Sequence, residues 1–124
     1  MAVHQTWAYE QGSQALCERL GYKNHKDMFW DIEASYKKAA KEINADFIIA
    51  SGELFQKIIS KEIGRVHRDT HASYGLGRYA LGLLWYRLLS GNSVVDNSFC
   101  DFDEELSSIQ TDTVKKCVEE ICAK

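Results

Sequence analysis

The sequence DFIIASG at residues 46–52 decides the expected fold. Residues 47–50 form a short, almost continuous apolar run, which is typical of a strand covered on both faces. Ser51-Gly52 ends the run, and the pattern that follows predicts a helix over about residues 53–61. A buried strand that leads directly into a helix is the repeating element of an α/β fold.

The residues before this stretch predict a strand and two helices. Residues 2–8 alternate loosely and suit a short strand, and Ser13 is predicted to cap a helix over residues 14–20. Asn24 is predicted to cap a longer helix whose first turn holds His25 facing solvent. Its apolar positions recur every three or four residues: Met28, Phe29, Ile32, Tyr36, Ala39, Ala40 and Ile43. Strand, helix, strand, helix predicts two parallel strands.

Two further helices are predicted after residue 61. Residues 62–72 are polar and predict an irregular segment, and a helix follows over about residues 73–89 with Ser73 at its N-cap. The glycines inside this helix predict close backbone packing at three positions: Gly75, Gly77 and Gly82. The last helix carries one apolar stripe: Val114, Cys117, Val118, Ile121 and Cys122.

The predicted fold class is therefore α/β, a single incomplete domain over residues 1–124 with a short parallel sheet and a helix-rich C-terminal half. Two strands are fewer than the roughly five of a doubly wound domain. Such a sheet leaves an unpaired edge and uncovered apolar faces. We expect these residues near that surface: Val3, Trp7, Phe47, Ile48 and Ile49. Self-association, or pairing with a complementing N-terminal fragment, is the expected consequence.

Composition excludes several classes of protein. The net charge of −3 and the pI near 5.8 give no basic surface for nucleic acid or an anionic membrane. The longest apolar stretch, residues 79–89, contains Arg87 and is too short to span a bilayer. The four cysteines match no zinc spacing, so we expect free thiols, no metal and no cofactor. A cytoplasmic location is expected, because residues 1–20 lack the pattern of a signal peptide.

The sequence HRDTHASYGLGRY at residues 67–79 carries the candidate chemistry. It places two histidines and a carboxylate after a predicted βαβ unit and before a helix. Catalytic groups of α/β enzymes gather in such segments, beyond the carboxyl ends of the strands.

This segment resembles GDSL-like (SGNH-type) hydrolases of a bacterial branch, in their C-terminal part. The matching stretches are RDTHASYGLGRY at 68–79, LLWY at 83–86, LSGNSV at 89–94, HQTWAY at 4–9, and DFII with SG at 46–49 and 51–52. The resemblance covers most of residues 3–95. It implies a flavodoxin-like three-layer sandwich and a serine esterase that acts on acyl groups of carbohydrates or other small molecules.

The resemblance assigns roles to two residues of this sequence. Asp69 would orient the imidazole of His71, and His71 would be the general base that deprotonates the serine. This sequence departs from the family pattern in two ways. Only Thr70 separates the two residues where the family normally has two, and no Gly-Asp-Ser occurs in the 124 residues. The strand with the serine is expected before Met1, so the chain is predicted to be inactive alone.

Other interpretations of these residues remain open. His4, Trp7 and Arg78 are candidate substrate-binding residues for a small-molecule ester. If the segment is extended, His67, Asp69 and His71 project to one side and form a possible metal site. A third alternative is a non-catalytic assembly or binding module that keeps part of the fold.

Overall fold

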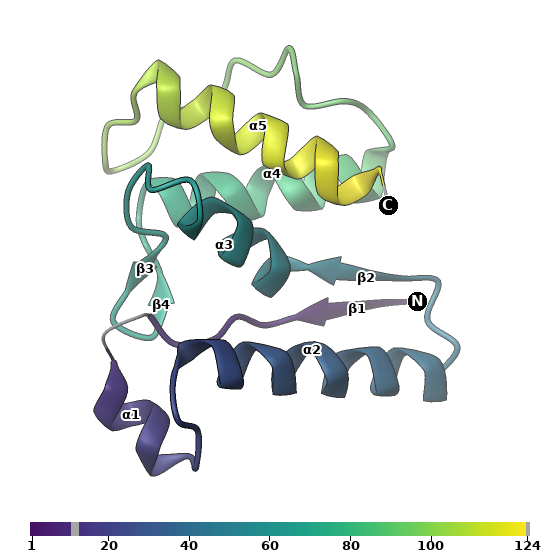
Figure 1. The fold of residues 1–124 in the computed structure, drawn as a ribbon. Helices are drawn as coiled ribbons and strands as arrows, with labels where there is room; N and C mark the ends of the chain where they lie inside the picture. Colours follow the sequence, from purple (N-terminus) through teal and green to yellow (C-terminus); the bar gives the residue numbers. More distant parts are fainter. Residues whose placement is uncertain (11–12, 124) are drawn as a thin grey trace. The chain divides into compact units, whose positions relative to one another are not determined.

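A computed structural model describes residues 1–10 and 13–123 (Figure 1). The elements in chain order are β1 (Ala2–Gln5), α1 (Gln14–Arg19), α2 (His25–Glu42), β2 (Phe47–Ala50), α3 (Ser51–Ile59), β3 (His67–Arg68), β4 (His71–Ala72), α4 (Leu76–Ser90) and α5 (Ser108–Cys122). The chain forms two compact units, residues 1–52 and 53–124, so α3 begins in the first and continues in the second.

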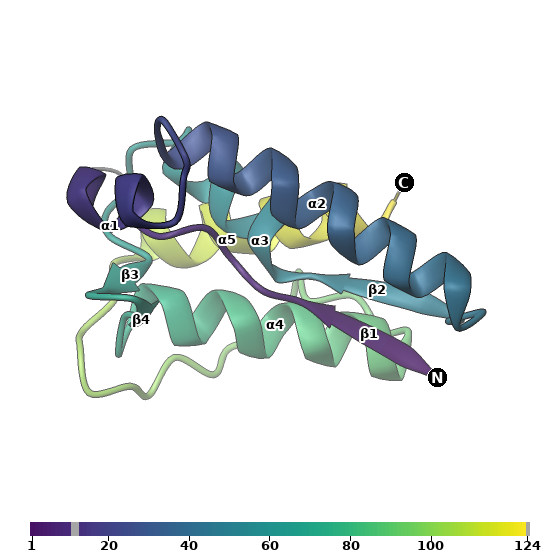
Figure 2. The ribbon, with the colours of Figure 1, turned by 90° about the horizontal axis from the view of Figure 1, so that it is seen from below.

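The first unit is built on a parallel pair of strands. β1 and β2 align Ala2 with Phe47 and Gln5 with Ala50. α2 lies along these strands, as both views show (Figures 1 and 2). The predicted parallel sheet and the mixed α/β class are thereby confirmed.

The two N-cap predictions of this unit have different outcomes. Asn24 accepts a hydrogen bond from the backbone N–H of Asp27 at 3.0 Å, so it caps α2 as predicted. Ser13 makes no side-chain cap bond to α1, so that prediction is wrong. The backbone still turns there, because Ser13 accepts from the N–H groups of Leu16 and Cys17 through its own carbonyl.

A small apolar cluster joins α1, α2 and the segment after β1. Its buried members are Ala8, Cys17, Met28 and Phe29, with Tyr9, Tyr22 and Ile32 packed against them. His25 is buried beside this cluster, and its Nδ1 is hydrogen-bonded to the Tyr9 carbonyl. The prediction of a solvent-facing His25 is therefore wrong, because the first turn of α2 lies against the chain at Tyr9.

The expected apolar surface of the strands is only partly present. Ile49 is buried, contrary to the prediction, whereas Val3, Trp7, Phe47 and Ile48 are half-buried. α3 also begins two residues earlier than predicted, at Ser51. A Cβ atom at Gly52 would lie 2.3 Å from the Thr6 carbonyl oxygen, so only glycine allows the helix to start this close to that backbone.

The second unit contains α4 and α5, which pack against each other. Its buried apolar residues come from three helices and the connecting segments: Leu54, Phe55, Ile58, Val66, Leu76, Tyr79, Ala80, Leu83, Leu84, Val94, Val114, Cys117, Val118 and Ile121. The predicted stripe on α5 is confirmed, except that Cys122 is only half-buried. Ser107 and Gln110 form a reciprocal capping box at the start of α5.

α4 begins and ends at glycines. Its N-cap is Gly75 rather than Ser73, and Gly91, at φ 76°, ends it. Gly82 has open space where its Cβ would be, so the prediction of close packing there is wrong. Across residues 1–10 and 13–123, none of the helices has both the length and the apolar character needed to cross a membrane.

Candidate functional site

The segment predicted to be irregular forms a tight β-hairpin. β3 and β4 pair in antiparallel register, with His67 opposite Ala72 and Arg68 opposite His71. Asp69 and Thr70 make the two-residue turn, and Asp69 has a positive φ of 49°. Aspartate tolerates this left-handed backbone better than most residues, so the local sequence suits the turn.

The Asp69 carboxylate folds back onto His71. Its Oδ1 accepts the backbone N–H of His71 at 3.0 Å and lies 2.5 Å from Nδ1 of the His71 ring. The hydrogen bond with this ring holds the pKa of the Asp69 carboxyl below its ordinary value. An acceptor at Nδ1 favours the tautomer with its proton on that nitrogen, which leaves Nε2 able to accept a proton.

The short Asp-Thr-His spacing therefore keeps the two side chains together. In a hairpin with a two-residue turn, the first turn residue and the residue two positions later can bond through an Asx-type contact. The side chains of Asp69 and His71 are 61% and 67% exposed, so both reach solvent. The structure brings together the two predicted catalytic residues, whose roles remain predictions.

Tyr74 lies between two arginines beside this pair. The Cζ atoms of Arg68 and Arg78 are 4.2 Å and 4.5 Å from the centroid of its ring. Arg68 is opposite His71 in the hairpin, so these two side chains leave the same face. The sequence had identified Arg78 alone. Arg68 and Tyr74 were missed, although arginines flanking an aromatic residue indicate cation–π contacts.

His67 does not join Asp69 and His71, and this removes the geometric basis of the metal interpretation. Because the turn reverses the chain, residues 67 and 71 lie on different strands and their side chains leave opposite faces. His67 is buried, with its ring edge-on to Phe55 at 5.4 Å. Among the residues that the structure describes, no three His, Cys, Asp or Glu side chains are grouped to hold a metal ion.

Ser73 is buried and links the hairpin to α4. Its hydroxyl donates to the Arg65 carbonyl at 3.0 Å and accepts the backbone N–H of Gly77 at 2.8 Å. Ser73 thus satisfies a free N–H of the first helical turn, although it is not the N-cap residue. A Cβ atom at Gly77 would lie 2.3 Å from the Val66 carbonyl oxygen, which confirms close packing there. These contacts fix the hairpin on the start of α4.

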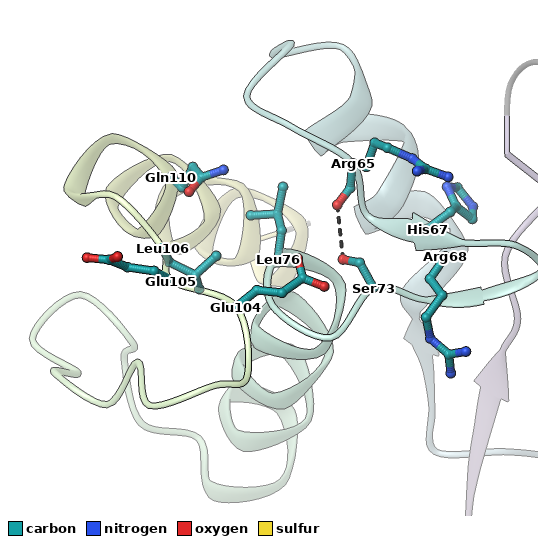
Figure 3. A pocket seen from close by; sticks show the side chains of 9 residues that line it. All are labelled: Arg65, His67, Arg68, Ser73, Leu76, Glu104, Glu105, Leu106 and Gln110. Atoms are coloured by element: carbon teal, nitrogen blue, oxygen red, sulfur yellow. Dashed lines mark hydrogen bonds between the residues drawn. The ribbon is translucent and has the colours of Figure 1, made fainter.

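A cavity of about 390 Å³ opens beside the hairpin (Figure 3). Its lining residues are Arg65, His67, Arg68, Ser73, Leu76, Glu104, Glu105, Leu106 and Gln110. Several of these polar groups already bind one another or the backbone: Gln110 donates to the Ile63 carbonyl and accepts from the Ser107 N–H. Arg68 is the residue that connects this cavity with the face that carries His71.

Two predicted substrate-binding residues lie in the first unit. His4 Nε2 is 2.8 Å from the hydroxyl of Ser51, which is fully buried at the end of β2. Burial lowers the pKa of the His4 imidazole, which favours the neutral ring. Trp7 is half-buried just beyond β1. The sequence did not predict the His4–Ser51 contact, because no local pattern relates residues that are 47 positions apart.

The described geometry defines an α/β protein with a parallel strand pair and an exposed aspartate–histidine pair. Residues 1–120 match a protein family described as Domain of unknown function (DUF4886), and the chain belongs to this family.

A crystal structure of a DUF4886 family protein from Bacteroides uniformis is similar to this chain, with a TM-score of 0.83 and 25% sequence identity. The similarity covers 98% of this chain and 47% of that one, so the chain spans about half the length of its relative. No curated protein matches the sequence.

Proposed function

We propose that this chain carries the acid–base pair of a GDSL-like (SGNH-type) serine hydrolase. The single observation that supports this proposal is the 2.5 Å contact between Asp69 Oδ1 and His71 Nδ1. It has the arrangement in which an aspartate orients a catalytic imidazole and leaves Nε2 for the nucleophile. A flavodoxin-like sandwich is part of the same proposal, and the parallel pair of β1 and β2 is consistent with it.

The proposed reaction is ester hydrolysis. His71 Nε2 takes the proton of a serine hydroxyl as its oxygen attacks the ester carbonyl, and returns that proton to the departing alcohol. Water then attacks the acyl-serine: His71 Nε2 takes a proton from the water and returns it to the serine oxygen, which releases the acid. Asp69 stays ionised and stabilises the imidazolium. Arg78 is proposed to bind the substrate, an acyl ester of a carbohydrate or another small molecule.

The nucleophile is proposed to come from outside these 124 residues. No Gly-Asp-Ser occurs in them, and the chain covers less than half of its longer structural relative. A complementing N-terminal segment or fragment would then provide the serine and most of the oxyanion-hole donors. Removing a nucleophile leaves only a small residual rate enhancement, so these residues by themselves are proposed to be inactive.

The alternative is a non-catalytic binding or assembly module, which the missing Gly-Asp-Ser favours. Self-association through the edge of β1 or β2 belongs to this alternative. The coding DNA around Met1 separates the two: an in-frame Gly-Asp-Ser upstream supports the hydrolase, and its absence supports the module.

The deciding experiment labels the product of the natural reading frame with a fluorophosphonate, which reacts with activated serines. We expect one labelled serine, and labelling at least roughly 100-fold slower in His71→Ala, because a general base contributes about that much. Thr70→Ala is the matched control, since it changes the turn residue between the pair and should label normally. Equal labelling of wild type and His71→Ala would refute the proposed role of His71.

The 124 residues alone provide a second test. Their hydrolysis of p-nitrophenyl acetate should be no faster than that of the same concentration of imidazole. A much faster rate that His71→Ala abolishes would reveal a nucleophile within these residues, contrary to the proposal.

A further inference from the structure

The arginines around Tyr74 are arranged to receive an anion. Two guanidinium groups lie 4.2 Å and 4.5 Å from the centre of one ring that is itself 37% exposed. The ring attracts each cation, but the two like charges beside one ring also repel each other. An anion that contacts both arginines would remove this repulsion.

The acidic neighbours of these arginines bind them weakly. Arg68 Nη1 is 3.6 Å from Asp69 Oδ2, and Arg78 Nη1 is 3.8 Å from Asp103 Oδ2. Both carboxylates are largely exposed, and neither contact has the two short parallel hydrogen bonds of a bidentate arginine–carboxylate pair. Exposed single contacts of this kind contribute little. Apart from the buried Nε of Arg68, the donors of both guanidinium groups are therefore still available to a ligand.

One of these donors is buried and unsatisfied. Among the described residues, Arg68 Nε has no hydrogen-bond partner although the atom is inaccessible to solvent. A buried N–H without an acceptor is unfavourable, and native structures rarely keep one without a reason. A shift of the partly exposed Arg68 side chain would bring Nε and a neighbouring Nη to a ligand oxygen, in the planar geometry that guanidinium prefers.

Arg68 is also next to the proposed catalytic pair. Arg68 leaves the same hairpin face as His71, and it lines the cavity of about 390 Å³. That volume is within the range of roughly 300–1,000 Å³ found for small-ligand sites. A charged group held by Arg68 and Arg78 would therefore place the rest of a small molecule near His71.

We infer that Arg68 and Arg78, across the ring of Tyr74, bind an oxyacid anion, a carboxylate or a phosphate, carried by the substrate. This inference rests on the proposed hydrolase for the word substrate, and it names the substrate class as anionic esters. The binding of the anion itself requires no hydrolysis and can be measured separately.

The test follows the Nε–H signals of the arginines by NMR while sodium acetate or sodium phosphate is added at constant ionic strength. We expect a saturable shift of the Arg68 signal with at least one of the two anions and none with chloride. Arg78→Lys keeps the charge but loses the planar fork, so it should weaken binding by roughly tenfold, or ~1.4 kcal/mol. Arg19→Gln, which removes an exposed charge on α1, is the matched control and should bind as wild type.

Each outcome has one meaning. Saturation by acetate alone identifies a carboxylate ligand, and saturation by phosphate alone identifies a phosphate ligand. If neither anion saturates, or if Arg19→Gln weakens binding as much as Arg78→Lys, the inference is overturned. If an anion binds saturably but His71→Ala labels its serine as fast as wild type, the anion site stands and the proposed hydrolase is refuted. If His71→Ala labels slowly but neither anion binds, the hydrolase proposal stands and the anion site is refuted.

Discussion

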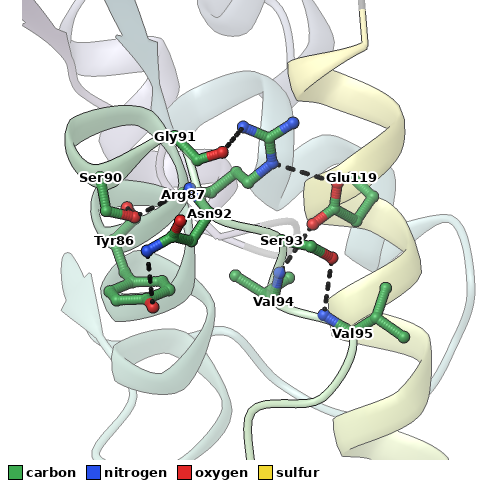
Figure 4. Close-up of polar contacts among 9 residues, drawn as sticks. All are labelled: Tyr86, Arg87, Ser90, Gly91, Asn92, Ser93, Val94, Val95 and Glu119. Carbon is green, nitrogen blue, oxygen red and sulfur yellow. Dashed lines mark hydrogen bonds and ion pairs between the residues drawn. The ribbon is translucent and has the colours of Figure 1, made fainter.

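Two acid–base contacts in the second unit illustrate different uses of a carboxylate. Asp69 and His71 are two residues apart, largely exposed, and joined within one hairpin. Arg87 and Glu119 are 32 residues apart, only 26% and 25% exposed, and joined between α4 and α5 (Figure 4). The first contact holds a side chain in one orientation, whereas the second holds segments of the fold together.

The contacts of Glu119 show why it is structural. Its Oε1 accepts the backbone N–H of buried Val94 at 2.8 Å and its Oε2 accepts Arg87 Nε at 3.1 Å. Arg87 also donates to the Gly91 carbonyl at 3.3 Å, so the turn after α4 is tied to α5 (Figure 4). Within residues 1–10 and 13–123, Asp69 bonds only inside its own turn, apart from the long Arg68 contact. An exposed pair that joins no separate segments of the fold is a candidate for a chemical role.

The largest effect should come from Glu119→Ala. It leaves the Val94 N–H buried without an acceptor and Arg87 without its partner, so the free energy of unfolding should fall by about 2 kcal/mol. Urea unfolding followed by circular dichroism measures this change. Glu120→Ala is the control, because Glu120 occupies the next position of α5 and pairs with Lys57 at the surface. A loss in Glu120→Ala as large as in Glu119→Ala would show that the Glu119 contacts stabilise nothing specifically.

The Arg87–Glu119 contact should weaken in acid. Burial alone would raise the pKa of Glu119, but the hydrogen bonds from Val94, Arg87 and Ser93 outweigh it and lower that pKa. A lowered carboxyl pKa means that the stabilisation is complete above the unfolded value, about 4.3, and is lost as the pH falls through the folded value. The difference in unfolding free energy between wild type and Glu119→Gln should therefore shrink below about pH 4. A difference that stays constant from neutral pH to pH 3 would contradict this account.

The smallest effect on stability should come from the hairpin pair. His71→Ala and Asp69→Gly remove exposed side chains, and glycine also suits the positive φ of residue 69. We expect the thermal midpoint of each variant to stay within about 2 °C of wild type. Thermal unfolding by circular dichroism measures it. A loss as large as that of Glu119→Ala would mean that the pair is structural, and the comparison would fail.

The sequence predicted the elements better than their contacts. The run at residues 47–50, the Asn24 cap and the stripe on α5 each depend on neighbours along the chain, and all three are confirmed. Burial of His25 depends on the Tyr9 carbonyl sixteen residues away, which no local pattern reveals. The same reason explains why Glu119, which binds Val94 and Arg87, was not identified.

The hairpin was missed because its strands are two residues long, too short for any alternation to appear. This omission also produced the error over His67, because an extended chain would place the side chains of residues 67 and 71 on one face, whereas the hairpin places them on opposite faces. Asp69 and His71 were identified from the family resemblance, and the turn geometry explains how a single intervening residue keeps them in contact.

The tautomer of His71 tests the central claim most directly, because the proposed base requires a proton on Nδ1 and a free Nε2. Long-range ¹⁵N–¹H correlation spectra of the neutral ring distinguish the two nitrogens. We predict the proton on Nδ1 in wild type and loss of that preference in Asp69→Gly, which removes the acceptor but suits the turn. A wild-type proton on Nε2, or the same tautomer in both proteins, would contradict the claim that Asp69 prepares His71 as a base.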